Sequence, residues 1–345
     1  MAKRFSIFIC ITTVCVAVII LAYFLVSIKK VSATLDESSY GLAKPLSQTE
    51  YNVYFSRYES VLRAEDPTAT VDLLKRDSAE NPSVSSSCHE LLHDVGRASY
   101  RKYGDLAKAL SYRDEFCVSA YIHGVLEGYF SQKPDSFSSA LKSACTSYPD
   151  ETLRGWQCYH GMGHALMYYS SNDLPESLRI CGSYATDFEK SACANGVFME
   201  NFNSDEKYHP SRYISETETF YPCDLDSTPF KNDCYMSAPI LYLRLHDYDF
   251  RGAISWCATV DEAYRASCYY GVGGQAARRN VENSKFLEDV CGLVLAPDNF
   301  SCLGGAVTYY FGYYGGSDVK GQSFCDRLSA INRELCKMVL HDALK

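Results

Sequence analysis

The stretch DFRGAISWCATVDEAYRASCYYGVGGQAARR, residues 249–279, decides the fold. It holds a short helix-forming segment that ends at Cys257, a polar linker, and a longer segment that starts at Cys268. The same arrangement recurs, and its cysteine pairs are Cys145/Cys158, Cys181/Cys193, Cys223/Cys234, Cys257/Cys268, Cys291/Cys302 and Cys325/Cys336. Their second members follow one another at steps of 35, 41, 34, 34 and 34 residues. A constant step near 34 is typical of stacked two-helix repeats.

Each repeat is expected to contain one long and one short helix. The long helices are expected to start at a cysteine, over residues 88–100, 117–130, 158–169, 193–202, 234–245, 268–279, 302–314 and 336–345. The short helices end at a cysteine, as in 173–181, 249–257 and 283–291, and Asp173, Asp249 and Asn283 stand where an N-cap residue would bind the free amides of the first turn. Glycines cluster early in the long helices, which predicts close approach of their backbones.

The cysteine spacing also predicts the disulfide bonds. Each of the six close pairs would join the end of a short helix to the start of the next long helix. A loop of about a dozen residues closed in this way stabilises the fold by roughly 3 kcal/mol. In the first unit, Arg113 stands where the short helix elsewhere ends in cysteine. Cys88 and Cys117 are then the two cysteines left without a partner, so we pair Cys88 with Cys117 by elimination.

The N-terminal part divides into segments of different composition. Residues 1–4 form a short tail, and residues 5–28 form an uncharged apolar run long enough to cross a bilayer. Residues 29–47 are expected to be a polar tether. Residues 48–87 show helical spacing of apolar side chains and are expected to form an N-terminal helical cap before the repeats of residues 88–345.

The cysteines indicate the compartment. Lys3 and Arg4 precede the apolar run, and Lys29 and Lys30 follow it, so the flanking charges give almost no orientation signal. Fourteen of the 16 cysteines follow the run, an even number typical of an oxidising compartment. We therefore expect a single-pass membrane protein with its C-terminal domain on the extracytoplasmic side. Val31-Ser32-Ala33 also fits a signal-peptidase site, which leaves a cleaved form as the alternative.

The charge and the aromatic content restrict the partners. The net charge is −9, and no basic stripe follows the apolar run, which argues against nucleic acid as a partner. Tyrosine is abundant, with 28 residues. Tyrosine rings commonly fill helix interfaces while their hydroxyls reach water, and the alternative is a groove that binds a protein or glycan.

The array resembles the cysteine-rich Sel1-like and tetratricopeptide-like helical repeat proteins. The resemblance covers roughly residues 88–345 and depends on the 34-residue period, the paired helices and the one disulfide per unit. The aromatic and proline positions of the tetratricopeptide signature are absent, and the cysteine spacing is wider than in the Sel1-like group. The resemblance implies an α-solenoid with a concave face that binds partners. Either an open solenoid or a closed ring is compatible with the sequence.

Histidines are concentrated in the first three long helices. They occur in the segments HELLH, HGVLE and HGMGH, as His89, His93, His123, His160 and His164. Glu127 lies one turn after His123, and residues four apart on a helix can bind one ion from the same face. Consecutive repeats stack, so we expect these side chains to form one site for a transition metal, namely zinc, iron, copper or a dinuclear pair. Asn195 and Glu200 in the fourth unit extend its edge.

Two details of the histidine pattern have alternative interpretations. Alignment on the cysteines superposes His123 with His164, whereas alignment on the His-Gly pairs superposes it with His160. HELLH also matches the zinc-peptidase pattern, with Glu90 as the general base, but Ser99 stands where a third histidine would be expected. Glu90 and Glu127 are therefore the candidate catalytic residues. His209, His246 and His341 are interpreted as ordinary hydrogen-bonded histidines.

The sequence thus supports two hypotheses of different classes. The first is a membrane-anchored extracytoplasmic helical-repeat protein with a histidine-rich metal site in its first three repeats, and whether that site catalyses a reaction is open. The second is a scaffold that binds a protein or glycan on a tyrosine-rich concave face. A zinc-dependent peptidase acting through HELLH is a lesser alternative.

Overall fold

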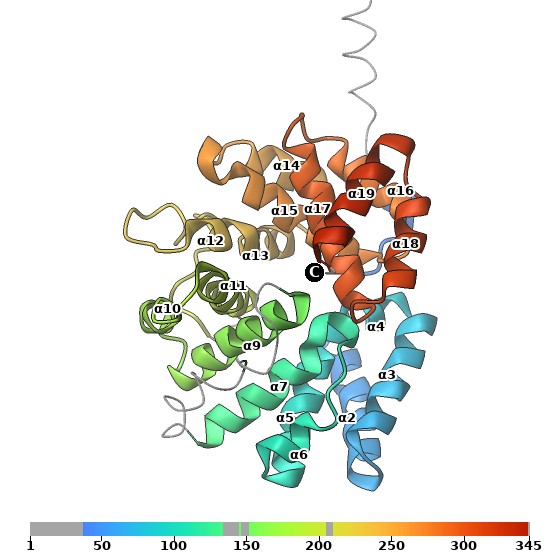
Figure 1. The fold of residues 1–345 in the computed structure, drawn as a ribbon, viewed down its shortest axis with the longest axis vertical. Helices are drawn as coiled ribbons and strands as arrows, with labels where there is room; N and C mark the ends of the chain where they lie inside the picture. The colour runs from blue at the N-terminus through green and yellow to red at the C-terminus, as the bar shows by residue number, and fades with distance from the viewer. Residues whose placement is uncertain (1–36, 134–144, 146–151, 205–209, 344–345) are drawn as a thin grey trace, which may run out of the picture. The chain divides into compact units, whose positions relative to one another are not determined.

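The computed structural model describes residues 37–133, 145, 152–204 and 210–343. The chain divides into two compact units, Met1–Ser39 and Tyr40–Lys345, and the second contains all the repeats. Every regular element in the described residues is a helix, as expected (Figure 1). No helix among them is both long enough and apolar enough to span a bilayer. The predicted tail 1–4, the predicted membrane span 5–28 and His209 lie outside the described residues.

The described helices alternate between long and short along the repeats. The long ones are α5 (Cys88–Tyr103), α7 (Phe116–Gln132), α9 (Leu153–Tyr169), α11 (Asp187–Asn203), α15 (Glu262–Arg279), α17 (Asn299–Tyr313) and α19 (Ala330–Ala343). The short ones are α6 (Leu106–Leu110), α10 (Leu174–Cys181), α14 (Phe250–Cys257), α16 (Ser284–Cys291) and α18 (Asp318–Asp326). The expected N-caps are present, because Asp173, Asp249 and Asn283 each accept a hydrogen bond from an amide of the first turn.

Several of the expected long helices have different bounds in the structure. Helices α9, α11 and α15 begin before their cysteines, not at them, because Thr152, Thr186 and Asp261 cap the earlier starts. The segment expected to be helical over 234–245 is split into α12 (Lys231–Ser237) and α13 (Pro239–Leu245). Pro239 explains the break, because proline has no amide hydrogen to donate within a helix.

The N-terminal residues of the second unit also differ in part from expectation. The helical cap is present as α2 (Gln48–Ala64), α3 (Pro67–Glu80) and α4 (Pro82–Ser86), preceded by the 3-10 helix η1 (Glu37–Tyr40). Residues 40–47, however, do not behave as a free tether. The Tyr40 hydroxyl donates to Asp289 at 2.5 Å, and its ring lies 5.2 Å from that of Phe286. Aromatic packing and a paired hydroxyl therefore fix the end of the segment that was expected to be a polar linker.

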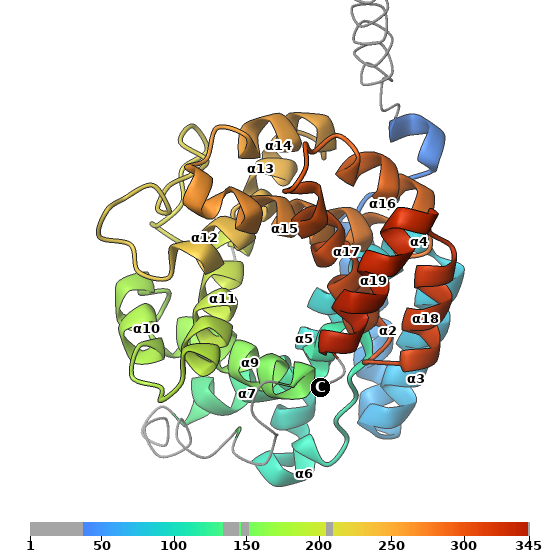
Figure 2. The same cartoon turned by 45° about the horizontal axis from the view of Figure 1, so that its top comes forward.

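The long helices follow one another around a ring (Figure 2). Contacts run from α5 to α7, α9, α11, α12, α15 and α17 in turn. Helix α17 then contacts α7, and α15 contacts α4, so the last repeats touch the first. An open array would leave these end surfaces exposed. Of the two forms that the sequence allows, the contacts match the closed ring.

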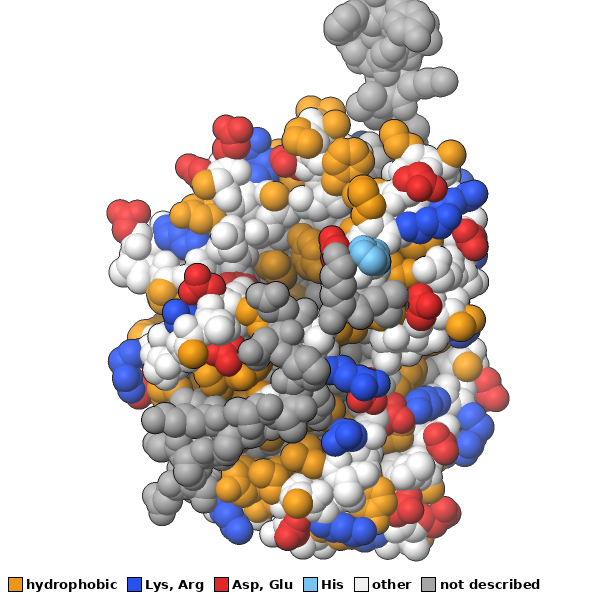
Figure 3. Space-filling view, viewed as in Figure 1, with side chains coloured by type: hydrophobic (Ala, Val, Ile, Leu, Met, Phe, Trp, Pro, Cys, Tyr) orange, Lys and Arg blue, Asp and Glu red, His pale blue; other side chains and the backbone are white. Residues whose placement is uncertain are grey.

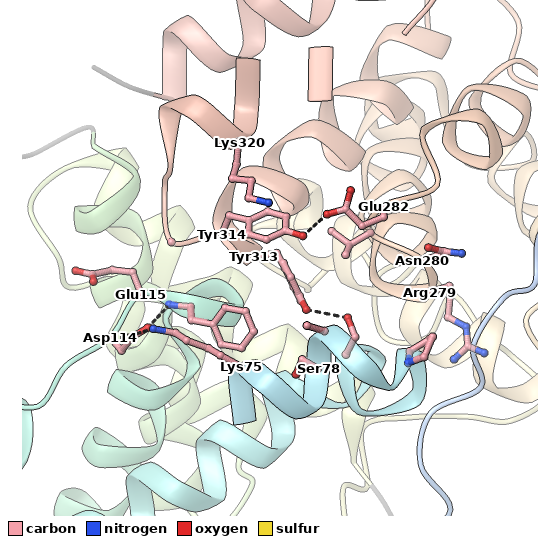
Figure 4. A pocket seen from close by; sticks show the side chains of 16 residues that line it. Lys75, Ser78, Asp114, Glu115, Arg279, Asn280, Glu282, Tyr313, Tyr314 and Lys320 are labelled. Carbon is pink, nitrogen blue, oxygen red and sulfur yellow. Dashed lines mark hydrogen bonds and ion pairs between the residues drawn. The ribbon is translucent and has the colours of Figure 1, made fainter. Parts of the chain in front are cut away.

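Polar contacts join the two ends of the array at a seam that Figure 4 shows from close by. The backbone of Phe116 pairs with that of Tyr314, and the Tyr313 hydroxyl lies 2.9 Å from that of Ser85. Nearby, Lys75 pairs with Asp114 at 2.6 Å, and the Tyr314 hydroxyl donates to Glu282. A cavity of about 740 Å³ lies between these side chains. Closure therefore depends on polar contacts as well as on helix packing.

In the described residues, seven disulfides join the cysteines in the predicted pairs, six of them predicted from the spacing and Cys88–Cys117 by elimination. They are Cys88–Cys117, Cys145–Cys158, Cys181–Cys193, Cys223–Cys234, Cys257–Cys268, Cys291–Cys302 and Cys325–Cys336. The first encloses α6 and differs from the rest in its longer separation of 29 residues. It ends at an irregular turn, because Cys117, Val118 and Ser119 have left-handed backbone angles, with φ of 55°, 62° and 57°.

Glycines allow the long helices to approach backbone to backbone. A β-carbon at Gly273 of α15 would overlap the carbonyl oxygen of Cys302 in α17, and one at Gly305 would overlap the carbonyl oxygen of Tyr270. A clash with backbone cannot be relieved by rotation of a side chain. The expected reason for the clustered glycines, close backbone contact, is therefore confirmed.

Two adjacent glycines of α15 provide a matched test of this contact. Gly273→Ala is expected to lower the free energy of unfolding by about 2 kcal/mol or more, because overpacking forces the helices apart. Gly274→Ala is expected to be neutral or stabilising, since the nearest atom to its β-carbon would be 3.8 Å away and alanine favours helix. Denaturant unfolding of both variants measures the difference. Equal effects would contradict the backbone-contact interpretation.

Candidate metal centre

Three neighbouring long helices bring together the histidines singled out by the sequence. His89 and His93 lie on α5, His123 on α7, and His160 and His164 on α9. The ring of His93 lies 5.3 Å from that of His123 and 5.0 Å from that of His164. All five side chains are buried. The stacking of the repeats thus produces one cluster of imidazoles, as the sequence predicts.

Glycine contacts set the spacing between these helices. A β-carbon at Gly124 of α7 would overlap the carbonyl oxygen of His93, and one at Gly196 of α11 would overlap that of His160. At Gly161 of α9, a β-carbon would lie 2.6 Å from the imidazole of His123. Each of these glycines faces a histidine of the cluster. The glycines in HGVLE and HGMGH therefore bring the imidazoles within reach of one another.

Two of the imidazoles have one nitrogen fixed as a donor by a backbone carbonyl. His89 Nδ1 lies 3.0 Å from the carbonyl oxygen of Cys117, and His123 Nε2 lies 3.0 Å from that of Gln157. A carbonyl oxygen can only accept, so these nitrogens carry the hydrogen. The remaining nitrogens, His89 Nε2 and His123 Nδ1, are then lone-pair atoms in the neutral rings. His123 Nδ1 is buried and makes no hydrogen bond within the described part of the chain.

Two further imidazoles of the cluster, those of His93 and His164, are held by carboxylates. His93 Nδ1 lies 2.6 Å from Glu127 Oε1, and His164 Nδ1 lies 2.5 Å from Glu200 Oε2. Carboxylates and carbonyls that bind the outer nitrogen of a histidine are typical of the residues around metal ligands, because they fix the tautomer and the ring orientation. In four imidazoles, therefore, one ring nitrogen faces an oxygen acceptor, and the second ring nitrogen does not face that acceptor.

Four ring nitrogens converge within the cluster. One nitrogen from each of His89, His93, His123 and His164 lies within 4.8 Å of one from every other. His93 Nε2 is only 3.1 Å from His89 Nε2, although the Nδ1 atoms of both rings face acceptors. Two lone pairs at this separation repel each other unless a proton or a cation lies between them. A metal ion would satisfy both nitrogens together with those of His123 and His164.

His160 occupies a different position from the other four histidines. It is not a member of the converging set, although its Nε2 lies 3.0 Å from His164 Nε2. Its Nδ1 is buried and makes no hydrogen bond within the described residues. The distance from the His123 ring is nearly the same to His160, 5.3 Å, as to His164, 5.4 Å. His123 therefore contacts both, and His164 is the one that belongs to the converging set.

Glu127 is more deeply buried than Glu200, the other carboxylate that holds an imidazole. Its side chain is fully buried, and it accepts a hydrogen bond from Arg97 Nη1 as well as the contact from His93. Arg97 also donates to Asp94 at 2.5 Å and to the Tyr168 hydroxyl at 3.0 Å. Glu127, His164 and Glu200 form a second group with ligand atoms within 4.8 Å of one another. Both carboxylates thus border the imidazole cluster.

The environment favours neutral imidazoles at three positions. Burial lowers the pKa of His89, His123 and His160, and neighbouring imidazoles lower it further. Burial also acts to lower the pKa of His93, but the Glu127 carboxylate outweighs it, and the pKa of His93 is raised. The pKa of Glu127 is raised by burial and lowered more strongly by His93 and Arg97, so it lies below its ordinary value. Metal binding requires the neutral imidazole.

Glu90, the would-be general base of HELLH, lies outside both groups of candidate ligands. Its carboxylate forms an ion pair with Arg278 of α15, across the seam of the ring. Of the two expected catalytic carboxylates, Glu127 borders the cluster and Glu90 does not. The geometry gives the peptidase interpretation no support, because a general base must reach the water held by the metal.

The sequence analysis did not single out three groups that contact the imidazole cluster or its carboxylates, namely Arg97 and the backbone carbonyls of Cys117 and Gln157. Arg97 is one turn after His93 on the same helix, so its spacing was a usable signal. The carbonyls of Cys117 and Gln157 carry no signal in the residue type. Glu200 was expected to extend the edge of the site, and it does so by binding His164. Asn195 lies on the neighbouring helix α11 and is buried.

A cavity of about 750 Å³ adjoins the cluster. His89 and His160 line one part of it, and residues of α7, α9, α11, α12, α13, α15, α17 and α19 also contribute to the lining. In Figure 3, hydrophobic side chains are visible in the hollow near the middle of the face, between rims that carry charges of both signs. The candidate ligands are therefore next to a space large enough for a small molecule.

No protein-family model, curated protein or solved structure matches this chain. The resemblance to Sel1-like and tetratricopeptide-like proteins therefore remains a prediction from the repeat length and the cysteines. The assignment of a function depends on the geometry of the site.

The ion pair between Arg97 and Glu127 gives a test of the site's architecture. Arg97→Met is expected to lower the free energy of unfolding by about 3 kcal/mol, because it leaves the buried Glu127 carboxylate without its arginine partner. Arg101→Met, at an exposed position on the same helix, is the matched control and is expected to change stability by less than about 0.5 kcal/mol. Thermal unfolding of both variants provides the measurement. Similar stabilities would show that the pair does not hold the site together.

Proposed function

We propose that this protein binds one transition-metal ion through His89, His93, His123 and His164. Glu127 and Glu200 act as positioning residues, since each holds the outer nitrogen of a ligand. Imidazole ligands suit zinc, iron and copper, and these are the candidate ions. The converging nitrogens, the fixed tautomers and the enclosing carboxylates all support this assignment.

The observation that carries the proposal is the separation of 3.1 Å between His89 Nε2 and His93 Nε2. In tetrahedral coordination with metal–nitrogen bonds of about 2.0–2.1 Å, ligand nitrogens are about 3.3–3.4 Å apart. The pair is therefore close to the separation that a bound ion imposes. In the absence of an ion, a second proton on His93 would have to bridge the pair, and the Glu127 carboxylate favours that proton. Metal content distinguishes the bound ion from the proton.

The cavity beside the cluster supports a role for the ion beyond stabilising the fold. A metal ion can polarise a carbonyl or activate water when a small molecule has access to it. His89 both belongs to the converging set and lines the cavity. We therefore propose that the ion acts on, or binds, a small molecule in this cavity. Glu127 already contacts His93 and Arg97. We therefore assign it the role of orienting His93 and not that of a general base.

The setting of the metal centre is part of the same proposal. Residues 5–28 would anchor the chain in a membrane, and the disulfide-rich ring would lie on the extracytoplasmic side. The alternation of long and short helices supports a closed form of the two-helix repeat array. Seven disulfides are consistent with an oxidising compartment. A form cleaved after residue 33 would release the same ring without its anchor.

The alternative function, a scaffold for a protein or glycan, receives less support. Its concave surface was expected to be rich in tyrosine. Tyr270 and Tyr309 are the tyrosines that line the described cavity, and the other aromatic or long apolar side chains there include Trp156, Phe188 and Met199. Many tyrosines instead pack against one another between helices, as Tyr100 does with Tyr129 and Tyr235 with Tyr264. This is the ordinary use of tyrosine that its abundance first indicated.

Metal content is the direct test of the proposed function. The purified full-length chain is expected to contain about one equivalent of zinc, iron or copper by mass spectrometry of the elements. The double variant His123→Ala, His164→Ala removes two of the four ligands and is expected to lose at least nine-tenths of the bound metal.

His341→Ala provides the control, because His341 is exposed near the end of α19. It is expected to retain the full metal content. Circular dichroism of all three proteins separates loss of ligands from loss of fold. Absence of stoichiometric metal from the folded natural protein, even after incubation with each ion, would refute the proposal.

A further inference from the structure

The cavity beside the candidate metal centre is lined by apolar and polar side chains, and its charged lining residues are Arg278 and Asp342. Its wall includes Trp156 and Phe188, together with Met199, Met236 and Ile240. Arg278 of α15 also lines it and has a side chain that is only 14% exposed. Cavities of this size commonly hold a drug-sized ligand, with a few polar groups that fix its orientation. Arg278 is the cationic group of the lining, and its charge favours apolar ligands that carry an anionic group.

Arg278 retains hydrogen-bond donors after its contacts within the protein. Its Nε donates to the carbonyl oxygen of Ser86 at 3.1 Å, and its Nη2 donates to Glu90. A guanidinium has five N–H groups, so three have no acceptor among these contacts. The two amino nitrogens of the fork match the two oxygens of a carboxylate. A carboxylate from the cavity side can therefore bind without displacing the Ser86 contact.

A further buried group of the lining lacks a partner. Gln157 Oε1 makes no hydrogen bond within the described residues, although the side chain is less than one-tenth exposed. Buried polar atoms without partners are costly, and a bound molecule would remove that cost. Polar groups around an otherwise apolar space are the pattern expected of a ligand-binding chamber, not of a packing defect.

The position of Arg278 connects the cavity with the metal centre. Its partner Glu90 is the residue next to His89, which belongs to the converging set of imidazoles. His89 and Arg278 both line the cavity, so a carboxylate bound to Arg278 would share this space with one candidate ligand of the proposed ion. The apolar remainder of the ligand would extend toward Trp156 and Phe188.

We propose that the central cavity binds an apolar monocarboxylate, with its carboxylate on Arg278 and its hydrocarbon or aromatic body against Trp156 and Phe188. The inference deepens the proposed function, because it names the class of molecule that is brought to the metal centre. Binding by Arg278 does not require the ion. The test can therefore be made on metal-free protein, and its outcome is independent of metal content.

Tryptophan fluorescence reports on this cavity. The chain has two tryptophans, and Trp256 stacks on Phe220 and Tyr242 away from the lining. In a full-length Trp256→Phe protein, held in lipid nanodiscs and freed of metal by a chelator, the signal comes from Trp156 alone. Phenylbutyrate is expected to cause a saturable change with a Kd at least tenfold lower than that of the neutral phenylbutyramide.

Three substitutions in this background identify the group that binds the acid. Arg278→Gln is expected to remove the preference for the acid over the amide. Arg265→Gln, on the same helix but outside the lining, is expected to leave the preference unchanged. Glu90→Gln removes the carboxylate that competes for Arg278 and is expected to tighten binding of the acid severalfold.

Several results would overturn the proposal. One is no saturable change with phenylbutyrate, and another is equal binding of acid and amide. A third is an unchanged preference in folded Arg278→Gln protein. If that variant does not fold, unchanged or weaker binding of the acid by Glu90→Gln protein would have the same consequence.

Discussion

Backbone-to-backbone contact between successive long helices is the constraint on which the rest of the structure depends. Gly124 against the carbonyl of His93, and Gly196 against that of His160, leave no room for a side chain between the helices. Helices at this separation place the imidazoles of adjacent repeats in contact. Glycine lowers helix propensity, and the disulfides offset part of that loss by joining neighbouring repeats. The cluster of imidazoles is thus a consequence of how closely the repeats stack.

The features that follow from local pattern could be predicted from the sequence. The cysteine spacing predicts the pairs that form disulfides, and Asp173, Asp249 and Asn283 predict the starts of short helices. The prediction that long helices begin at their cysteines missed the earlier starts of α9 and α11. Thr152 and Thr186 cap these starts, and threonine is an ordinary N-cap residue. Ring closure could not be predicted. It depends on a small rotation accumulated over every repeat, and no single segment encodes that sum.

In the candidate site, too, local sequence pattern predicted some features and could not predict others. Helical spacing and repeat stacking were enough to group five histidines with Glu127. They were not enough to distinguish His164 from His160, because that difference depends on ring orientation. The carbonyl of Cys117 is placed by three left-handed residues at the start of α7, an irregularity that the residue types do not reveal. Glu90 lies apart from the cluster because it pairs with Arg278, a partner 188 positions away in the chain.

X-ray absorption at the metal edge of the purified protein tests the central claim most directly, because it reports which atoms surround the ion. The structure predicts about four nitrogen ligands at about 2.0–2.1 Å, with the multiple-scattering pattern of imidazole and no sulfur shell near 2.3 Å. Fewer than three imidazoles, or a sulfur ligand from an opened disulfide, would contradict the assignment of His89, His93, His123 and His164 as the metal ligands.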